Sequence, residues 1–327
     1  MQKHGNVHSV YFDDKNGLCY CDNSRTVKFI ASDIVLFLDI ELLLPAYENY
    51  IHMLSENGIK IFTFIHDLIP IRFRKYSTIN VRRFKNFVDA ALRLSDGIIA
   101  NSNFVMNDIK DYIQQNSKIQ TRQNISFSFT HLGSDCIKKN FSSDEKKDTK
   151  KRPIRFLMVS TISPRKRYPQ AVKAFDILWR RNYDVTLTIV GRTVHENQKD
   201  AKVIRKNKQL NKKLFWFSQG ISDEELQKLY ESTDAVIFAS EAEGFGLAIT
   251  EAASYSKPLI IRNIAVFREV AENGAFYFDG FRPGELASAI ESWISLYKKN
   301  EHPKTESINS ISWTECAENI YKAIAGE

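Results

Sequence analysis

Three adjacent cations form the first segment that could bind a phosphorylated ligand. Arg165, Lys166 and Arg167 follow the apolar run Ile154–Ser160 and a proline, Pro164. A guanidinium offers a planar fork of donors, an ammonium is a compact charge, and a following helix would add partial positive charge at its N-terminus. This combination suits a pyrophosphate. A solvated basic turn is the alternative, and the spacing alone does not separate the two.

Two carboxylates and two glycines form the second segment. Glu243 precedes Gly244 and Gly246, and Glu251 follows about two helical turns later. The glycines let backbone N–H groups approach a ligand closely, and they open a predicted helix whose N-terminus favours an anion. Each carboxylate can accept two hydrogen bonds, which suits the vicinal hydroxyls of a hexose or a ribose. The alternative is one acid at a helix N-terminus and another that faces solvent.

The third segment is His66-Asp67, at the end of the apolar run Ile59–Ile65. A histidine at a strand end can donate a proton or a hydrogen bond to a sugar or its phosphates. A structural histidine is the alternative interpretation. Asn101-Ser102 follows another short apolar run, Gly97–Ala100, in the same way.

Short apolar runs alternate with segments of helical periodicity on both sides of a polar stretch, Ser142–Arg152. This pattern predicts βαβ crossovers and an α/β fold with parallel sheets in two domains, residues 1–141 and 153–310. Ligands of such sheets bind beyond the carboxyl ends of the strands, where all the segments above lie, and two facing domains would form a cleft. The predicted strands are Ile34–Phe37, Ile59–Ile65, Gly97–Ala100, Ile154–Ser160, Val185–Val190, Ala235–Phe238 and Pro258–Ile261. The predicted helices are Tyr47–Asn57, Val81–Leu94, Asn103–Gln114, Tyr168–Arg180, Glu224–Glu231 and Gly246–Ser254.

Composition excludes several classes of protein. Of the 327 residues, 43% are hydrophobic and 26% charged, which is ordinary globular usage and excludes extended disorder. We expect a cytoplasmic protein, because no apolar run approaches the roughly 18 residues of a membrane span and the first residues lack a secretory signal. The net charge of +7 allows an anionic partner. The basic run Lys202–Lys213 has few aromatics to stack bases, so we expect no nucleic-acid partner.

Several of these segments occur in the order seen in retaining glycosyltransferases of family 4, which have the two-domain GT-B fold. The chain resembles that family from Ile154 to about Trp293, and its Glu-x7-Glu spacing is the most specific element. The first half resembles it more faintly, through His66–Pro70 and Ser95–Ser102. The variant is similar to enzymes that assemble bacterial surface polysaccharides. The segments that carry the resemblance are Arg165-Lys166, Gly220–Leu226, Leu229-Tyr230, Ala235–Ser240, Glu243–Leu247, Glu251-Ala252, Pro258 and Arg268–Val270.

The resemblance implies a role for each matching residue. Arg165 and Lys166 would hold the donor diphosphate, and Glu243 would bind hydroxyls of the donor hexose. The remaining donor-binding positions are Gly244, Phe245, Gly246 and Leu247 through backbone N–H groups, Glu251 at the ribose, and Ile221 at the nucleobase. His66 would reach the donor sugar across the cleft and complete a catalytic set with Arg165, Lys166 and Glu243, while Asp67 and Ser102 would lie on the acceptor side.

The resemblance also implies the substrates. The donor would be a nucleotide diphosphate sugar, with GDP-mannose the first expectation, and the acceptor a hydroxyl of a lipid-linked oligosaccharide or polysaccharide such as O-antigen or capsule. No cofactor or metal is expected, and the sequence contains no Asp-x-Asp. Retention is ascribed in this family to front-face attack, so no protein nucleophile is expected. The alternative is a catalytically inactive GT-B relative that serves as partner or scaffold of another transferase.

Three further expectations concern the surroundings of this site. Basic and aromatic residues alternate between Arg72 and Lys85, which suits peripheral contact with an anionic membrane at the inner face of the cytoplasmic membrane. A solvated face over core aromatics is the alternative. In the family, a C-terminal helix, here within 311–327, crosses back onto the first domain. The glycine usual before Pro258 is replaced by Ser256, so the turn there must use serine or differ in shape.

Overall fold

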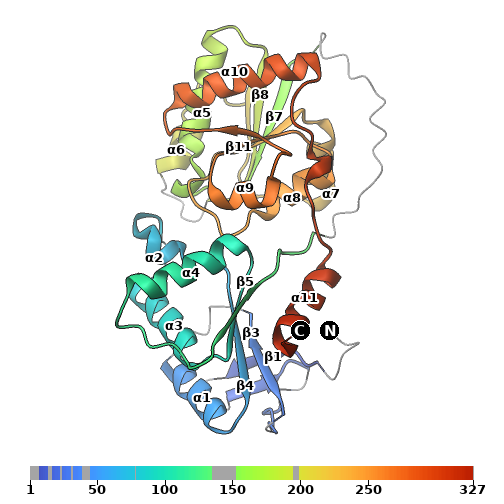
Figure 1. Ribbon diagram of the computed structural model, residues 1–327. Coiled ribbons are helices and arrows are strands. Elements are labelled where there is room, and N and C mark those ends of the chain that lie inside the picture. The colour runs from blue at the N-terminus through green and yellow to red at the C-terminus, as the bar shows by residue number, and fades with distance from the viewer. Residues whose placement is uncertain are drawn as a thin grey trace. The chain divides into compact units, whose positions relative to one another are not determined.

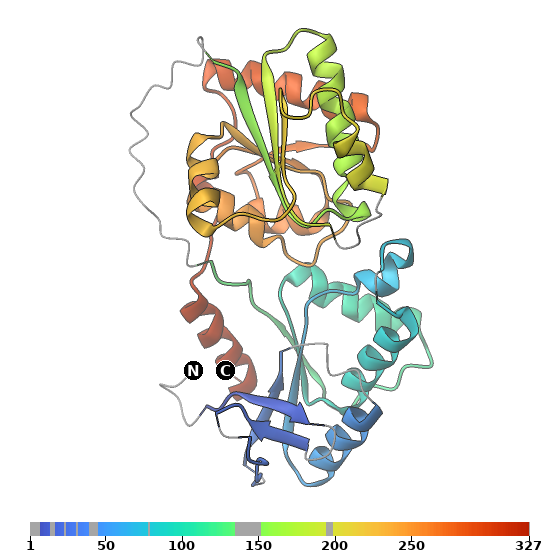
Figure 2. The same cartoon turned by 180° about the vertical axis from the view of Figure 1, so that it is seen from behind.

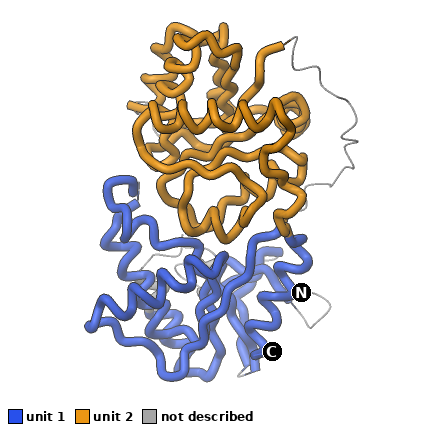
Figure 3. Tube along the Cα trace, turned by 45° about the horizontal axis from the view of Figure 1, so that its top comes forward, with its two compact units in different colours: residues 1–133, 311–327 blue, residues 134–310 orange. Residues whose placement is uncertain are grey.

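The computed structural model describes residues 7–13, 17–22, 24–30, 32–38, 45–77, 79–134, 152–193 and 199–326. The chain divides into two units, coloured separately in Figure 3. Unit 1 contains residues 1–133 and 311–327, and unit 2 contains residues 134–310. The predicted linker Ser142–Arg152 lies outside the described residues, apart from Arg152.

Unit 2 is built on a six-stranded parallel sheet with the strand order β12-β11-β10-β7-β8-β9 (Figure 1). The chain runs outward from β7 through β8 to β9, then returns to β10 on the other side of β7 and runs outward again. The sheet therefore has its topological switch point between β7 and β10. The strands are β7 (Ile154–Val159), β8 (Val185–Val190), β9 (Leu214–Phe217), β10 (Ala235–Phe238), β11 (Leu259–Arg262) and β12 (Phe276–Phe278).

Helices cover both faces of this sheet (Figures 1 and 2). On one face α10 packs along α5, with α6 beside α5, and on the other α8 packs against α9. The rings of Phe156, Phe175 and Trp293 meet edge to face inside the first layer. The helices are α5 (Tyr168–Arg180), α6 (Lys199–Arg205), α7 (Asp223–Ser232), α8 (Leu247–Ser254), α9 (Ala265–Ala271) and α10 (Pro283–Lys299).

Unit 1 contains a four-stranded parallel sheet in the order β3-β4-β5-β6, together with the antiparallel hairpin of β1 (Val10–Asp13) and β2 (Gly17–Tyr20). The C-terminal helix α11 packs on this sheet, because Cys316 and Ile320 bury their side chains with Phe62, Phe64 and Ile99. The remaining elements of unit 1 are β3 (Ile34–Phe37), β4 (Lys60–Ile65), β5 (Gly97–Ala100), β6 (Ser126–Phe129), α1 (Pro45–Glu56), α2 (Ile69–Arg72), α3 (Val81–Leu94), α4 (Asn103–Gln115) and α11 (Trp313–Ala325).

The predicted helices and strands are confirmed, with bounds that agree within one or two residues, but several other strands were not predicted. Those are β1, β2, β6, β9 and β12, which are short and mostly lie at sheet edges. Serine does take the place of the usual glycine after α8: Ser256 has a φ of +51°, in the left-handed region. None of the helices among the described residues is both long and apolar enough to cross a membrane.

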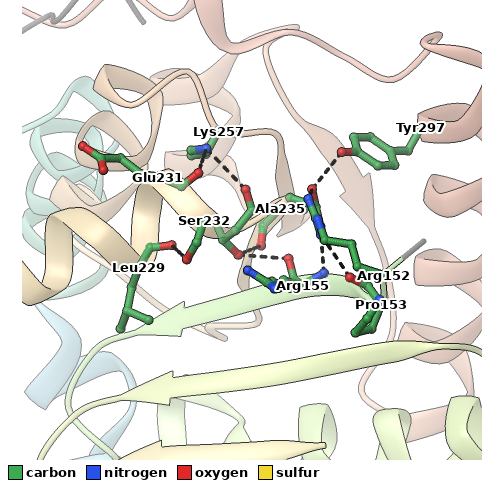
Figure 4. A network of polar contacts seen from close by, with 11 residues as sticks. Arg152, Pro153, Arg155, Leu229, Glu231, Ser232, Ala235, Lys257 and Tyr297 are labelled. Carbon is green, nitrogen blue, oxygen red and sulfur yellow. Dashed lines mark hydrogen bonds and ion pairs between the residues drawn. The ribbon is translucent and has the colours of Figure 1, made fainter. Parts of the chain in front are cut away.

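A network of polar contacts fastens the amino ends of β7 and β10 in unit 2 (Figure 4). Arg152 binds both carboxylate oxygens of Asp234, from Nη1 at 2.6 Å and from Nη2 at 2.8 Å. The backbone N–H of Arg155 and the hydroxyl of Tyr297 each donate a further bond to that carboxylate, both at 2.9 Å. Nearby, Lys257 Nζ donates to the carbonyl of Glu231 at 2.9 Å. The buried acid is therefore fully paired within the protein.

Candidate active site

The carboxyl ends of β7 and β10 bring the predicted cations and the predicted acid together. After β7, residues Pro164–Lys166 form a single 3-10 turn, which presents Arg165 and Lys166. After β10, a loop leads from Ala239 to Gly246 and carries Glu243. The backbone N–H of Glu241 donates to the carbonyl of Arg165 at 2.8 Å, so the two loops are joined through their main chains. Both segments thus meet at the switch point of the sheet.

Glu243 is shared between the two cations. Arg165 Nη1 donates to Glu243 Oε2 at 2.6 Å and to the carbonyl of Ala242 at 2.9 Å, while Lys166 Nζ donates to Glu243 Oε1. The Glu243 side chain is only 10% exposed, against 16% for Lys166 and 27% for Arg165. The cations therefore form the accessible side of the cluster, and the acid lies beneath them.

Burial and ion pairing have opposite effects on the pKa of Glu243. Burial raises the pKa of its carboxyl, but the charges of Lys166 and Arg165 and a hydrogen bond from Ser240 outweigh burial and lower the pKa below its ordinary value. The acid is therefore ionised at neutral pH. It balances one of the two positive charges of the cluster. Burial lowers the pKa of Lys166 and the charge of Arg165 adds to this effect, while the charge of Glu243 opposes it.

A second ion pair lies beside the first. The guanidinium of Arg167 binds Glu241, with Nε donating to Oε2 at 2.7 Å. The main chain of Arg167 has a φ of +58°, in the left-handed region. This conformation ends the 3-10 turn and starts α5 without a side-chain cap. Arg167 belongs to the predicted run of three cations, but its pairing with Glu241 was not predicted.

Helix α8 begins at Leu247, four residues after Glu243. Gly246 precedes the helix with a φ of +105°, and a Cβ there would lie 3.1 Å from the ring of Phe267, so glycine is required by backbone conformation and by space. Phe245 is buried and Leu247 is exposed. The first N–H groups of the helix, together with its dipole, favour an anion at this end.

Glu251 lies on α8 close to the start of α7. Burial raises the pKa of its carboxyl, and the charge of Asp223 raises it further, while a hydrogen bond from the Tyr230 hydroxyl opposes both. Asp223 is the first residue of α7, whose capping box is formed by Ser222 and Glu225, and Ile221 precedes this cap as a half-buried side chain. Glu251 is thus close enough to Asp223, two residues after Ile221, to be affected by its charge, and the roles of Glu251 and Ile221 toward a nucleoside stay predictions.

The predicted residues of unit 1 already have partners within that unit. His66 Nε2 lies 2.9 Å from the carbonyl oxygen of Leu38, and its ring packs against Phe64. Asp67 accepts a hydrogen bond from the N–H of Ile69 at 2.8 Å, and Ser102 caps α4 by accepting from the N–H of Val105 at 3.1 Å. These contacts show how the three side chains are held in place. Their roles toward a sugar or an acceptor stay predictions.

Several cations of the Arg72–Lys85 surface are paired with acids. Arg72 binds Asp108 at 2.8 Å, and Lys85 binds Asp89 at 2.5 Å. Burial raises the pKa of Asp108 in spite of the opposing effect of Arg72. Membrane contact through this surface therefore stays a prediction. Across the described ranges, no cluster of three or more histidine, cysteine or acidic residues could hold a metal ion.

Comparison with known proteins identifies the family and several relatives. Residues 140–309 match the family model described as "Glycosyl transferases group 1". The chain is 35% identical over 311 residues to the "Serotype-specific mannosyltransferase WbdA" of Escherichia coli, which covers 90% of this chain and 37% of that protein. It is 28% identical over 165 residues to the "O-antigen chain mannosyltransferase RfbU" of Salmonella typhimurium, covering 50% of this chain and 45% of the relative. The chain thus spans little more than a third of WbdA.

Solved structures share the fold. The Anabaena protein Alr3699/HepE, solved in complex with UDP and glucose, has a TM-score of 0.67 and 18% identity, covering 89% of this chain and 78% of that one. A glycosyltransferase from Rickettsia africae has a TM-score of 0.62 and 23% identity, covering 90% and 77% of the two chains. These likenesses confirm the predicted α/β fold class, GT-B, with a parallel sheet in each of two Rossmann-like units.

Proposed function

We propose that this chain, which belongs to the glycosyl transferases group 1 family, transfers a hexose from a nucleotide diphosphate sugar to a hydroxyl of a glycan. The observation that carries the proposal is the cluster of Arg165, Lys166 and Glu243 at the switch point of unit 2. The names of the relatives favour mannose as the sugar and an O-antigen type of surface glycan as the acceptor. They also favour an enzyme over an inactive scaffold. GDP-mannose is the donor we propose first.

The charges of the cluster suit a leaving diphosphate. In the proposed reaction the bond from the sugar C1 to the diphosphate oxygen breaks, and negative charge develops on that oxygen. Both bonds named for Arg165 use Nη1, and an ammonium has three N–H groups, so each cation keeps donors for phosphate oxygens while it stays bound to Glu243. Such preorganised donors stabilise developing charge. We therefore propose that the reaction needs no metal.

The sugar and the nucleoside have candidate contacts beside the phosphates. Glu243 lies between the cations and the N-terminus of α8, where it can accept hydrogen bonds from hexose hydroxyls, and the N–H groups of Gly244–Leu247 would line the same side. Glu251 would bind the ribose, and Ile221 would contact the base. His66 would contact the donor sugar, with Asp67 and Ser102 on the acceptor side.

Retention of configuration is the second part of the proposal. The acceptor oxygen would attack C1 on the face from which the diphosphate leaves, and the departing phosphate oxygen would take the acceptor proton. Bonds and protons then balance without a protein nucleophile. Analysis of the product by NMR tests this step, because an inverted anomeric configuration would refute it.

A thermal-shift screen against GDP-, UDP- and dTDP-sugars is the most direct test of donor binding. A ligand that binds only the folded state raises the melting temperature, by an amount that grows with its concentration over Kd. We expect a rise with GDP-mannose and its loss in Lys166→Ala. Turnover of GDP-mannose with a lipid-linked mannan acceptor tests the transfer itself. If none of the nucleotide sugars shifts the wild type, the proposed function is wrong.

Peripheral binding to an anionic membrane is a separate proposal, which rests on the surplus of cations between Arg72 and Lys85. Sedimentation with phosphatidylglycerol vesicles at low salt tests it. We expect binding that is lost at high salt, since each cation near such a surface contributes about 1 kcal/mol. If the protein stays in the supernatant at low salt, this proposal fails without affecting the transferase proposal.

A further inference from the structure

A buried arginine at the end of β11 binds three separate segments of unit 2. Arg262 is only 2% exposed. Its Nε donates to the carbonyl of Ala239 at 3.0 Å, its Nη1 donates to the carbonyl of Gly280, and its Nη2 donates to Gln170 Oε1 at 2.5 Å. The planar guanidinium is suited to this task, because it holds its donors in fixed directions.

Gln170 completes the connection from the other side. This side chain, 5% exposed, lies in the first turn of α5. Its Nε2 lies 3.3 Å from the carbonyl of Gly280 and 3.2 Å from that of Arg282, while its Oε1 accepts from Arg262. Arg262 and Gln170 together form what we call the carboxyl-end brace.

The brace joins the two segments that present the candidate active site. Ala239 immediately precedes the loop that carries Glu243, and Gln170 lies three residues beyond the turn that ends at Arg167. The Arg165–Glu243 ion pair and the main-chain hydrogen bond from Glu241 to Arg165 join the two loops directly, and the brace adds a second connection, from Ala239 to Gln170. The brace holds both loops in place through Arg262 and Gln170, and it uses none of the N–H groups of Arg165 or Lys166.

The guanidinium of Arg262 stays charged at neutral pH in spite of its burial. It lies over the rings of Phe278 and Phe281, at 4.9 and 4.5 Å from the ring centroids. Burial, followed by repulsion from Arg167, lowers the pKa of Arg262 to about 10, while the acids Glu241, Asp279 and Glu285 oppose that effect. The group remains protonated at neutral pH, and its N–H groups remain donors.

We propose that Arg262 and Gln170 are positioning residues for the donor site, which hold the Glu243 loop and the Arg165-Lys166 turn at the spacing that a diphosphate sugar requires. The inference rests on the proposed function for its ligand. Phosphate binding between two loops depends on their spacing, and a misplacement of about 1 Å can cost about 100-fold in rate. The brace therefore acts on turnover and donor affinity through residues that the ligand touches.

The test compares Gln170→Met with Tyr297→Phe. Methionine keeps the length and helix propensity of glutamine but removes its hydrogen bonds. Tyr297→Phe removes one buried hydrogen bond to Asp234 at the opposite end of the same sheet, so it controls for a general loss of stability. Four quantities are measured at a temperature where both variants are folded: Kd for GDP, kcat and KM with GDP-mannose, and the rate of amide hydrogen exchange in the peptides covering 160–170 and 238–248.

We expect Gln170→Met to raise Kd for GDP and lower kcat, each by about 10-fold. It should also speed exchange in both peptides, whereas Tyr297→Phe should leave these quantities within twofold of wild type. Equal behaviour of the two variants would overturn the inference. The exchange measurement needs no ligand: if wild type bound no nucleotide, the proposed function would fail, and faster exchange in Gln170→Met alone would still support the brace.

Arg262→Lys gives an independent check. Lysine keeps the positive charge but cannot direct donors to three segments at once. We expect the same loss of GDP affinity as in Gln170→Met, and the double variant should lose little more than either single one, because the two side chains act as one unit. Fully additive losses would contradict the brace.

Discussion

The two ends of the unit 2 sheet each hold an arginine bound to a buried carboxylate, and we propose a ligand site at only one of them. At the amino ends of β7 and β10, the Asp234 side chain is 1% exposed and accepts four hydrogen bonds from Arg152, Arg155 and Tyr297. At the carboxyl ends of the same strands, Glu243 holds two cations whose outer sides are partly exposed.

This difference separates a structural ion pair from a functional one. The carboxylate of Asp234 has about four lone-pair positions, and the protein fills all of them. At the carboxyl end, two cations share the single carboxylate of Glu243, and α8 begins four residues later. The side chains of both cations are partly exposed. Our proposal therefore places the binding site where charge at a strand end is not fully paired within the protein, and an ion pair alone does not indicate one.

Removing a cation at the carboxyl end should have the largest effect. We expect Lys166→Ala to lower turnover of GDP-mannose by at least about 100-fold, because stabilisation of the developing diphosphate charge is lost. Glu243→Ala should lower it as much, because the proposed contact with the hexose hydroxyls and the counter-charge that positions both cations are lost. Steady-state kinetics measures this change, and circular dichroism checks that the fold is kept. Near-normal turnover in either variant would refute the roles assigned to this pair.

Breaking the amino-end pair should change stability instead. Asp234→Asn leaves Arg152 without its counter-charge, and we expect the free energy of unfolding to fall by about 3 kcal/mol. Urea denaturation followed by tryptophan fluorescence measures this loss. Kd for GDP should stay within twofold of wild type. An affinity loss like that of Lys166→Ala would show that the two ends are not distinct in function.

A buried histidine next to the amino-end network predicts a pH dependence. His302 packs against Trp293 and Tyr297, and Lys304 Nζ lies 3.1 Å from its Nε2. Burial, then the charge of Lys304, lowers the pKa of His302 to about 4, with Glu306 opposing them. The unfolded chain binds a proton near pH 6.5 and the folded chain does not, so stability falls as the pH drops from 6.5 to 4.

The size of this effect follows from the shift in pKa, and we expect a loss of about 2–3 kcal/mol over that range. Urea unfolding at several pH values measures it. His302→Gln should be less stable at pH 7.5 but should show a shallower dependence on pH. An unchanged slope in this variant would assign the pH dependence to other groups.

Much of the site could be predicted from the sequence because of where parallel strands end. β10 is buried along its whole length and β7 from Phe156 to Met158, so each contains a short apolar run that is followed within a few residues by polar ones. That rule placed Arg165, Lys166 and Glu243 at one edge of the sheet, and the structure joins them. By contrast, β6 reads Ser-Phe-Ser-Phe at an edge, and β12 has three residues, so neither gives such a signal.

The carboxyl-end brace could not be predicted in the same way. Arg262 ends the apolar run of β11, which marks it as unusual, but its three acceptors are two backbone carbonyls and one amide from distant segments. Backbone carbonyls carry no sequence signal. The ion pair of Arg167 with Glu241 could not be predicted, because an ion pair between loops depends on the path of both loops.

A substitution in the turn after the C-terminus of α8 should have the smallest effect. Ser256 follows α8 with a φ of +51°, a conformation that glycine adopts without the steric cost of a Cβ. We expect Ser256→Gly to raise the free energy of unfolding by about 0.5–1 kcal/mol, with no change in Kd for GDP. Thermal unfolding measures this change in stability. The matched control is Ser288→Gly inside α10, which should lower the stability of the protein because the φ of Ser288 is already helical. If both variants lost stability alike, the left-handed turn would carry no strain. If Ser256→Gly also altered Kd, the division between ligand-binding and purely structural parts of unit 2 would have to be redrawn to include this turn.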